Sequence, residues 1–136
     1  MIFQNFLEQI PEDLRNFQVR GFIENNRSNL LSGLKNTSTL SNDKISYCLE
    51  ISVNTHRRYA KRPDLIKTKT KEHILLLILL FKKGNRVLGS NNNFKDWLDK
   101  ENLFFDNSKP ISYLQFISGI RFIDDRLVAM EYGDNV

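Results

Sequence analysis

The stretch from Gly84 to Gly133 has the sequence GNRVLGSNNNFKDWLDKENLFFDNSKPISYLQFISGIRFIDDRLVAMEYG. This pattern predicts a compact helical module that is punctuated at Trp97-Leu98, Pro110, Gly119 and Gly133. No group of residues within it is arranged to carry out chemistry on its own. We therefore expect this part of the chain to bind a partner.

Local signals predict the elements of the module. We expect Trp97 to anchor the core, because an indole ring buries a large area in a small domain; the alternative is a direct contact with the partner. Pro110, Gly119 and Gly133 are interpreted as structural: a helix start, a helix stop and a turn of the chain. The predicted elements are a short helix over Phe94–Asp99, a turn at Asp106-Asn107, a helix over Ile111–Ile117 and a last helix that starts at Asp124.

Upstream of the module, the sequence predicts one long helix over Lys69–Leu88, closed by Gly89. The run Ile74–Phe81 is apolar nearly all round, so both sides of this helix must be covered. One side can pack on its own domain. We predict that the other side forms a homodimer interface, since it too must be buried. Eight apolar residues are far too few to span a membrane.

The segment before the long helix predicts two short helices. Ser41 is a good N-cap for the first, residues 50–52 form a break, and Asn54 or Ser52 caps the second, which Pro63 ends. Two short helices joined by a tight turn are typical of a helix-turn-helix, although the usual Gly of the turn is absent. The alternative is a plain helical hairpin with a solvated basic face.

If the second helix is a recognition helix, its early residues reach base edges and its basic residues meet phosphates. Thr55 and Arg57 are the candidates for base contacts, and Arg58, Lys61 and Arg62 are the candidates for phosphate contacts. The predicted DNA-binding set is Asn54, Thr55, Arg57, Arg58, Lys61 and Arg62.

The charge of the chain is divided unevenly along its length. The net charge of the 136 residues is +4, yet Val53–Lys71 carries seven basic residues and one acidic residue, and Asp96–Val136 carries four basic residues and eight acidic ones. A basic middle and an acidic end suggest two different partners, since net charge governs association and not the fold. Solvated surface charge is the alternative for either cluster.

Other functional classes find little support. The single Cys48 excludes an internal disulfide, fits a reducing cytoplasm, and has apolar neighbours typical of a buried, inert thiol. His56 and His73 lack Cys or acidic neighbours at ligand spacing, so we expect no metal site. The sequence shows no nucleophile elbow and no Gly-rich phosphate loop, so we expect no enzyme activity and no cofactor. Asp124-Asp125 is interpreted as a helix N-terminal charge effect.

The start of the chain predicts two short helices, Gln4–Gln9 and Pro11–Gln18, and no signal peptide.

These residues resemble the Xre/MbcA/ParS antitoxins of type II toxin–antitoxin modules. The stronger resemblance lies in the C-terminal toxin-binding domain of that family, over about fifty residues: Trp97-Leu98, Asn102, Pro110 with Leu114, Gly119, Leu127 and Glu131-Tyr132-Gly133. The weaker one is to the helix-turn-helix of that family, through Ile51-Ser52, Thr55 and Arg57-Arg58.

The chain departs from the family pattern at a few positions. The family usually has Ala three positions before the Trp, where this chain has Phe94, and an Ala common ahead of a neighbouring Gly is replaced by Gly84. Phe104-Phe105 replaces smaller residues in the loop before Pro110. These changes suggest repacking within the same fold and leave the identity of the cognate toxin open.

The resemblance implies an all-α fold: a small helical bundle with a helix-turn-helix domain at 1–66 and a toxin-binding domain at 67–136. It implies an antitoxin whose cognate toxin is commonly a RES-domain enzyme that consumes NAD, blocked by covering its active-site cleft, partly with the C-terminal end of the antitoxin. It also implies binding of the helix-turn-helix to the promoter of its own operon.

We assign toxin contacts to the C-terminal end of the chain. A short, polar, acidic terminus can enter a basic nucleotide-binding pocket, although many chain ends are simply frayed. The predicted toxin-binding residues are Arg126, Met130, Tyr132, Gly133, Asp134, Asn135 and Val136. The alternative function is a stand-alone transcriptional regulator whose C-terminal module mediates dimerisation.

Overall fold

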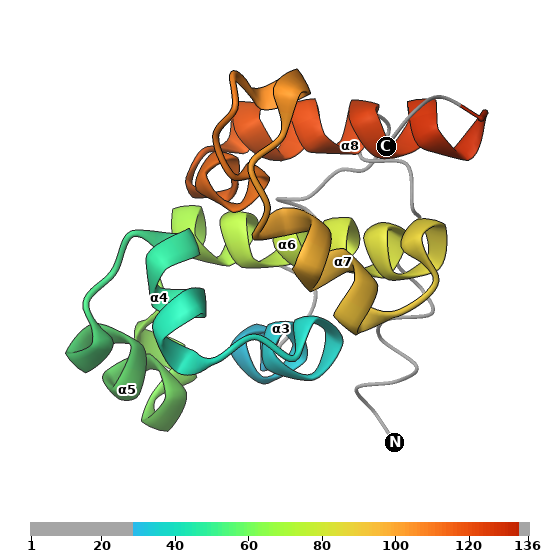
Figure 1. The fold of residues 1–136 in the computed structure, drawn as a ribbon. Helices are drawn as coiled ribbons and strands as arrows, with labels where there is room; N and C mark the ends of the chain where they lie inside the picture. The colour runs from blue at the N-terminus through green and yellow to red at the C-terminus, as the bar shows by residue number, and fades with distance from the viewer. Residues whose placement is uncertain (1–28, 134–136) are drawn as a thin grey trace.

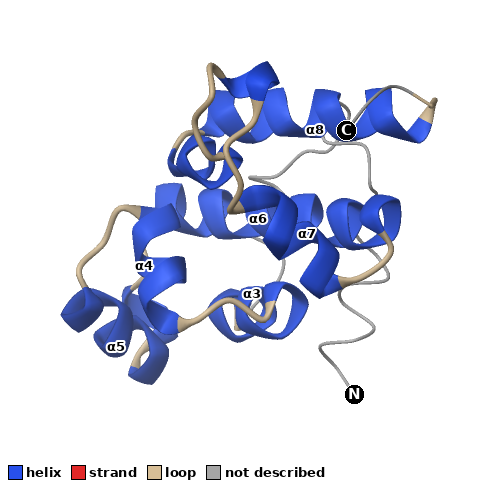
Figure 2. Cartoon of the chain, in the orientation of Figure 1, coloured by secondary structure: helices blue, strands red, loops and turns tan. Residues whose placement is uncertain are grey.

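The computed structural model describes residues 29–133, and within this range every regular element is helical (Figures 1 and 2). The prediction of an all-α fold is confirmed. The two helices expected near the start of the chain, Gln4–Gln9 and Pro11–Gln18, lie outside the described residues. The elements are α3 (Leu30–Ser38), α4 (Asn42–Leu49), α5 (Val53–Lys61), η1 (Pro63–Leu65), α6 (Thr68–Leu88), α7 (Asn91–Leu98), η2 (Leu103–Phe105), η3 (Pro110–Gln115) and α8 (Ile117–Glu131).

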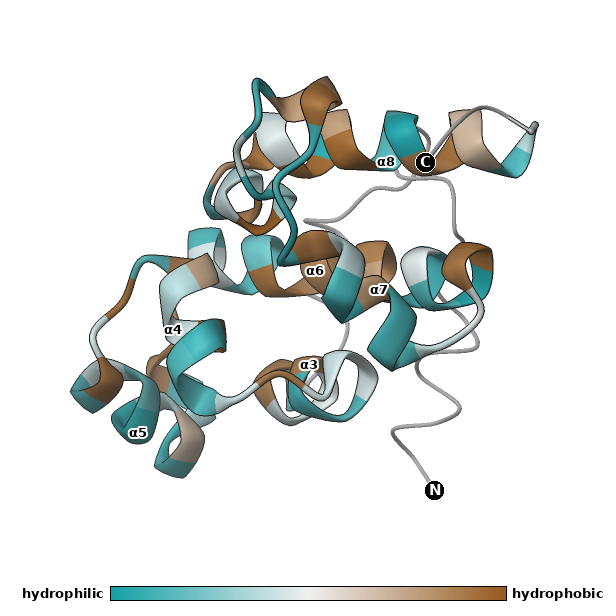
Figure 3. Ribbon diagram, in the orientation of Figure 1, coloured by the Kyte–Doolittle hydropathy of each residue, from teal (hydrophilic) through white to brown (hydrophobic). Residues whose placement is uncertain are grey.

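The long helix α6 is the centre of the fold. It begins at Thr68, one residue before the predicted start, and ends where Gly89 adopts the left-handed conformation at φ 98°. Every residue of Ile74–Phe81 is buried. Helices α3, α7 and α8 pack against α6 from different sides (Figure 1), and Figure 3 shows its middle as strongly hydrophobic.

This packing bears on the predicted homodimer. The prediction rested on the need to cover both sides of α6, and helices of the same chain meet that need. Burial of α6 therefore gives no reason for a second copy, and the homodimer stays a prediction. The domain boundary expected between residues 66 and 67 likewise stays a prediction. The helix that follows this boundary, α6, packs against α3 on one side and α8 on the other.

Helices α4 and α5 form where the capping residues predict them. The hydroxyl of Ser41 accepts a hydrogen bond from the backbone N–H of Lys44 at 3.2 Å, and the hydroxyl of Ser52 accepts one from Thr55 at 3.0 Å. Ser52, and not Asn54, is thus the cap of the second helix. Glu50 takes the left-handed conformation at φ 52° in the turn where a glycine is usual.

The predicted start of α7 is three residues too late. The helix covers Asn91–Leu98 and not Phe94–Asp99, because the Ser90 hydroxyl accepts a hydrogen bond from the backbone N–H of Asn93 at 3.0 Å. The polar run before Phe94 is therefore the first turn of the helix and not a loop.

The interpretation of Gly119 as a helix stop is wrong. The helix expected over Ile111–Ile117 is the 3₁₀ helix η3, which begins at Pro110, and α8 starts at Ile117 and continues through Gly119. A Cβ on Gly119 would overlap the backbone carbonyl oxygen of Tyr113. The glycine is required because η3 crosses α8 at backbone contact.

The interpretation of Asp124 as the start of the last helix is also wrong. Asp124 lies within α8, is buried, and accepts a hydrogen bond from the ammonium of Lys83 in α6 at 2.6 Å. Both side chains are less than a tenth exposed, at 9% and 7%. Asp124 is thus a buried ion-pair partner that links the two helices, and no N-terminal charge effect applies to it.

An aromatic cluster joins α6, α7 and η2. Phe94 packs edge-on against Phe81 with ring centroids 5.0 Å apart, and it stacks on Trp97 at 6.1 Å. Trp97 in turn meets Phe105 edge-on at 5.6 Å. The ring of Trp97 is 7% exposed and is part of the core. These contacts fix α7 and the η2 turn relative to the central helix.

Candidate nucleic-acid and protein interfaces

Helix α5 presents a basic outer surface. Asn54, Arg57, Arg58 and Lys61 are exposed, while His56 and Tyr59 are buried on the inner side of the same helix. Burial, and then the nearby charge of Lys35, lowers the pKa of His56 below its ordinary value. The imidazole is therefore neutral at pH 7, and the positive charge of this helix comes from its Arg and Lys residues.

The two residues predicted to reach bases differ in their exposure and in their hydrogen bonds. Arg57 is exposed and its guanidinium donates a hydrogen bond to the amide oxygen of Asn54 at 3.1 Å. Thr55 is half-buried, and its Oγ1 accepts a hydrogen bond from the Ser52 hydroxyl at 2.9 Å. The outer face thus presents Asn54 and Arg57 together, whereas Thr55 takes part in the helix cap.

The residues predicted to meet phosphates also differ in whether another side chain already compensates their charge. Arg58 lies over the ring of Tyr59, at 5.8 Å from its centroid, and Lys61 is exposed. The Arg62 guanidinium donates two hydrogen bonds to the carboxylate of Asp64, a bidentate contact with lengths of 3.0 and 2.8 Å. That hydrogen bond lowers the pKa of Asp64, so the carboxylate stays charged and compensates Arg62. Arg58 and Lys61 are accordingly the stronger phosphate candidates.

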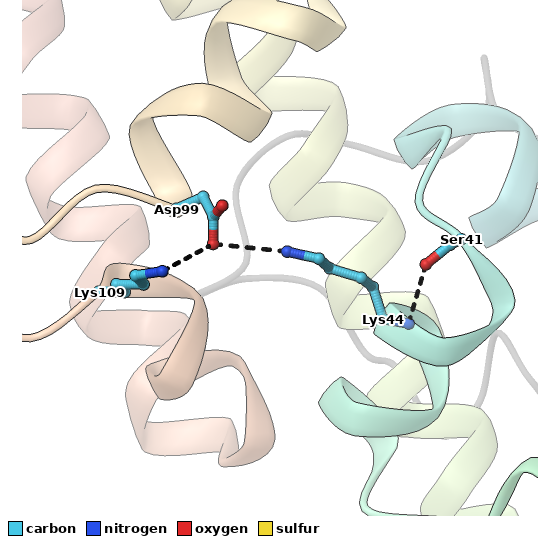
Figure 4. Close-up of polar contacts among 4 residues, drawn as sticks. All are labelled: Ser41, Lys44, Asp99 and Lys109. Atoms are coloured by element: carbon cyan, nitrogen blue, oxygen red, sulfur yellow. Dashed lines mark hydrogen bonds and ion pairs between the residues drawn. The ribbon is translucent and has the colours of Figure 1, made fainter.

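Polar contacts link α4, the helix before the basic one, to the C-terminal half of the chain. Asp99, at the end of α7, accepts from Lys44 of α4 at 3.4 Å and lies 3.6 Å from the ammonium of Lys109 (Figure 4). The two ammonium groups lower the pKa of Asp99. A second link is the hydrogen bond that the Gln115 amide donates to the backbone carbonyl of Tyr47 at 2.9 Å.

The predicted toxin-binding residues lie at the end of α8. Arg126 and Met130 are half-buried, Tyr132 is 85% exposed, and Gly133 has a φ of 92° with nothing near its missing side chain. Glu131 forms an ion pair with Arg86, which ties the end of α8 to the end of α6. Asp134, Asn135 and Val136 lie outside the described residues.

Sequence reasoning missed a group of exposed apolar side chains near the start of α8. Leu103 is 79% exposed, Phe104 48% and Phe122 48%, and the first two belong to the η2 turn. The guanidinium of Arg126 lies over the ring of Phe104 at 3.7 Å, which joins the turn to α8. The departure of Phe104-Phe105 from smaller residues was the one signal in the sequence that pointed to this surface.

Residues 29–133 contain no cluster of three or more His, Cys, Asp or Glu residues able to hold a metal ion. No helix in that range is long and apolar enough to cross a membrane. Cys48 is fully buried, and burial raises the pKa of its thiol to about 12. It is an inert core residue at neutral pH.

The chain is a small helical protein with a basic surface on α5 and a group of exposed apolar side chains at η2 and α8. Residues 83–133 match the family model described as the antitoxin Xre/MbcA/ParS C-terminal toxin-binding domain. The match supports an antitoxin role for the chain, and a toxin-binding domain implies a toxin as its protein partner. A comparison with curated proteins found no match to the chain. The matched range contains α7, η2, η3 and α8, together with the end of α6.

Proposed function

We propose that this chain is the antitoxin of a type II toxin–antitoxin module, and that it inhibits its cognate toxin by covering the active site. The observation that carries the proposal is the match of residues 83–133 to the toxin-binding domain family. As the resemblance implies, we take the toxin to be a RES-type enzyme that consumes NAD. We also place the complex in the cytoplasm, which the single Cys48 fits. The antitoxin itself acts as a stoichiometric inhibitor, without enzyme activity or cofactor.

The proposed toxin contacts are the C-terminal end of α8 and the residues that follow it. Tyr132 supports this role, because a large aromatic side chain that is 85% exposed at a helix end is available to a partner. Arg126 and Met130 lie one turn apart on the same helix. The set remains Arg126, Met130, Tyr132, Gly133, Asp134, Asn135 and Val136.

We further propose that α4 and α5 form a helix-turn-helix that represses the operon of the antitoxin by binding its promoter. The exposed basic side chains of α5 support this role, because phosphate neutralisation by Arg and Lys dominates DNA affinity. The contact set remains Asn54, Thr55, Arg57, Arg58, Lys61 and Arg62, with Arg62 the weakest member. A homodimer is part of the proposal, since most helix-turn-helix proteins of this kind read two half-sites.

The alternative is a stand-alone helix-turn-helix regulator whose C-terminal module mediates dimerisation. The exposed apolar side chains Leu103, Phe104 and Phe122 favour it, because such a surface also suits self-association. The two proposals differ in whether the chain needs a second, different protein.

Co-expression with the product of the adjacent reading frame separates the proposals. The antitoxin proposal expects the two proteins to co-purify, and expects cellular NAD to collapse only when this chain is missing. Co-purification with unchanged NAD would keep the antitoxin role and reject a RES-type toxin. No co-purification, with a harmless neighbour, would reject the antitoxin role and favour the regulator.

A further inference from the structure

A hollow of about 510 Å³ lies beside the η2 turn, within the matched domain. Trp97 and Leu88 line it with apolar surface, and Leu103 and Phe104 border it from the turn. Asp96 and Glu101 also line the hollow. The hollow is large enough for one or two protein side chains and is flanked by the most exposed apolar residue of η2.

The apolar surface continues from the hollow onto α8. Phe104 lies under the guanidinium of Arg126, and Phe122 stands one helical turn before Arg126. Phe122 is half-exposed, and it packs edge-on against the buried Phe105 with centroids 5.4 Å apart. Aromatic and Arg side chains of this kind dominate the affinity of protein interfaces.

The turn that carries Leu103 and Phe104 is held in one conformation. The Asn102 side chain accepts a hydrogen bond from the backbone N–H of Phe104 at 3.0 Å, and the backbone of Asn102 pairs with Ser108 in an isolated bridge. Phe105 anchors the turn in the core. A surface that is already ordered loses little conformational entropy when a partner binds.

The charges around the hollow define the chemistry of its partner. Asp96 and Glu101 are exposed and make no ion pair with any residue in 29–133, whereas Asp99 is paired with Lys44 and Lys109. Lys100 is the single basic residue that lines the hollow among the described residues. An apolar hollow lined by two carboxylates and one ammonium group has a net negative charge, which fits an apolar side chain flanked by basic residues.

A second copy of this chain fits the surface less well. In a two-fold dimer centred on the hollow, the same patch meets itself, so Asp96 and Glu101 would face their own equivalents. Like charges placed opposite each other in an interface cost binding free energy. The geometry and charge favour a different protein with a basic rim around an apolar anchor.

We propose that the cognate toxin docks on this hollow and on the adjoining patch of Leu103, Phe104 and Phe122, through an apolar side chain bordered by Lys or Arg residues. This inference rests on the proposed antitoxin function and names a surface that adjoins the proposed C-terminal contacts at Arg126. Phe122 and Tyr132 are ten residues apart on or at the end of α8, about 15 Å along the helix. One protein can therefore cover the hollow while the end of the chain reaches its active site.

The test measures the affinity of purified variants for the purified product of the adjacent reading frame, by titration calorimetry at two salt concentrations. Leu103→Ser removes an apolar side chain that is 79% exposed, so it leaves the fold intact, and Phe104→Ala removes the neighbouring ring. Leu65→Ser is the matched control, since Leu65 is 44% exposed in the 3₁₀ turn η1 outside the matched domain. Each hollow variant is expected to weaken binding roughly tenfold or more, and the control to leave it unchanged.

A charge variant tests the second half of the inference. Glu101→Lys is expected to weaken binding and to reduce its salt dependence, whereas Asp43→Lys, at an exposed site of α4 that does not line the hollow, is expected to do neither. Wild-type affinity in both hollow variants would overturn the docking surface and leave the antitoxin function standing. A loss of self-association with unchanged toxin affinity would assign the patch to a second copy and overturn the inference. Failure of the wild-type chain to bind the product at all would reject the proposed function itself.

Discussion

The ring of Phe94 occupies the space that a side chain at Gly84 would fill. A Cβ added to Gly84 of α6 would overlap the phenyl ring of Phe94, which is fully buried in α7. The two positions thus exchange volume across the α6–α7 contact: the larger side chain on one helix requires the absence of a side chain on the other.

This relationship predicts strong coupling between the two sites. Phe94→Ala should lower the free energy of unfolding by about 3–5 kcal/mol, because it empties a buried ring site. Gly84→Ala alone should be destabilising by about 1–3 kcal/mol, since the new methyl group overlaps the ring. The double variant should be more stable than the sum of the two single changes by at least about 1 kcal/mol, as measured by urea denaturation. Simple additivity would contradict the exchange.

The buried ion pair of Lys83 and Asp124 gives a second prediction. Asp124→Ala should lower the free energy of unfolding by about 3–5 kcal/mol, because it leaves the Lys83 ammonium buried without its partner. The double variant Lys83→Met, Asp124→Leu should cost much less, because it removes both charges from the α6–α8 contact. Thermal and urea unfolding of the three variants make the comparison. A double variant as unstable as Asp124→Ala would show that the pair contributes through shape and not through charge.

The bridge at Asp99 predicts a measurable pH effect. The charges of Lys44 and then Lys109 hold the pKa of the Asp99 carboxyl below its ordinary value of 3.8. A lowered pKa in the folded state means that the bridge stabilises the fold above pH 3.8, and that this contribution is lost as the pH falls through the pKa of the folded state. An NMR titration of the Asp99 carboxyl should give a value under 3.8 that rises toward it in Lys44→Met and Lys109→Met. An unchanged value in both variants would exclude the bridge in solution.

The proposed DNA contacts predict a characteristic salt dependence. Arg58→Ala and Lys61→Ala should each weaken promoter binding about equally for all sequences and reduce the slope of log affinity against log salt by about one. Arg62→Ala should have less effect, because Asp64 already compensates that charge. Arg121→Ala, an exposed basic residue of α8, is the control. Unchanged affinity and slope in the first two variants would contradict the recognition role of α5.

The proposed role of the chain end predicts a separation of folding from neutralisation. Deletion of Tyr132–Val136 should leave the unfolding transition nearly unchanged, since Tyr132 is 85% exposed and no atom lies near a Cβ at Gly133. The truncated chain should fail to neutralise the toxin in co-expressing cells. Deletion of residues 134–136 alone separates the tail from Tyr132. Full neutralisation by the longer truncation would refute the role of the chain end.

Local signals in the sequence were enough to predict α4, α5 and α6. Ser41 and Ser52 cap α4 and α5, and Gly89 ends α6, because caps act through neighbouring backbone groups. The second half was harder for a physical reason. Gly119 and Asp124 owe their identities to Tyr113 and Lys83, which are tertiary partners, so their local reading as a helix stop and a helix start failed.

Of the two candidate surfaces, one could be predicted from local sequence and the other depends on tertiary contacts. The basic face of α5 follows from the helical spacing of one segment, so it could be predicted from Arg57, Arg58 and Lys61. The hollow could not be predicted, because it forms where α7, the η2 turn and the end of α6 meet. Leu88 and Phe104 are far apart in the sequence, and no helical periodicity places them side by side. Exposure of Leu103 depends on the path of that turn and is visible only in three dimensions.

The shared helix α6 has a consequence for how this chain can change over time. Because α3 covers one side of α6 and α8 covers another, neither half of the chain can be exchanged for a foreign counterpart without re-forming that contact. Under the proposed function, a new toxin specificity would arise by substitution on the outer surface of α7, η2 and α8, where side chains such as Leu103 are free of the core. Under the same proposal, a new operator specificity would arise in the same manner on α5. Partner choice can therefore drift residue by residue at both ends while the central helix stays constant.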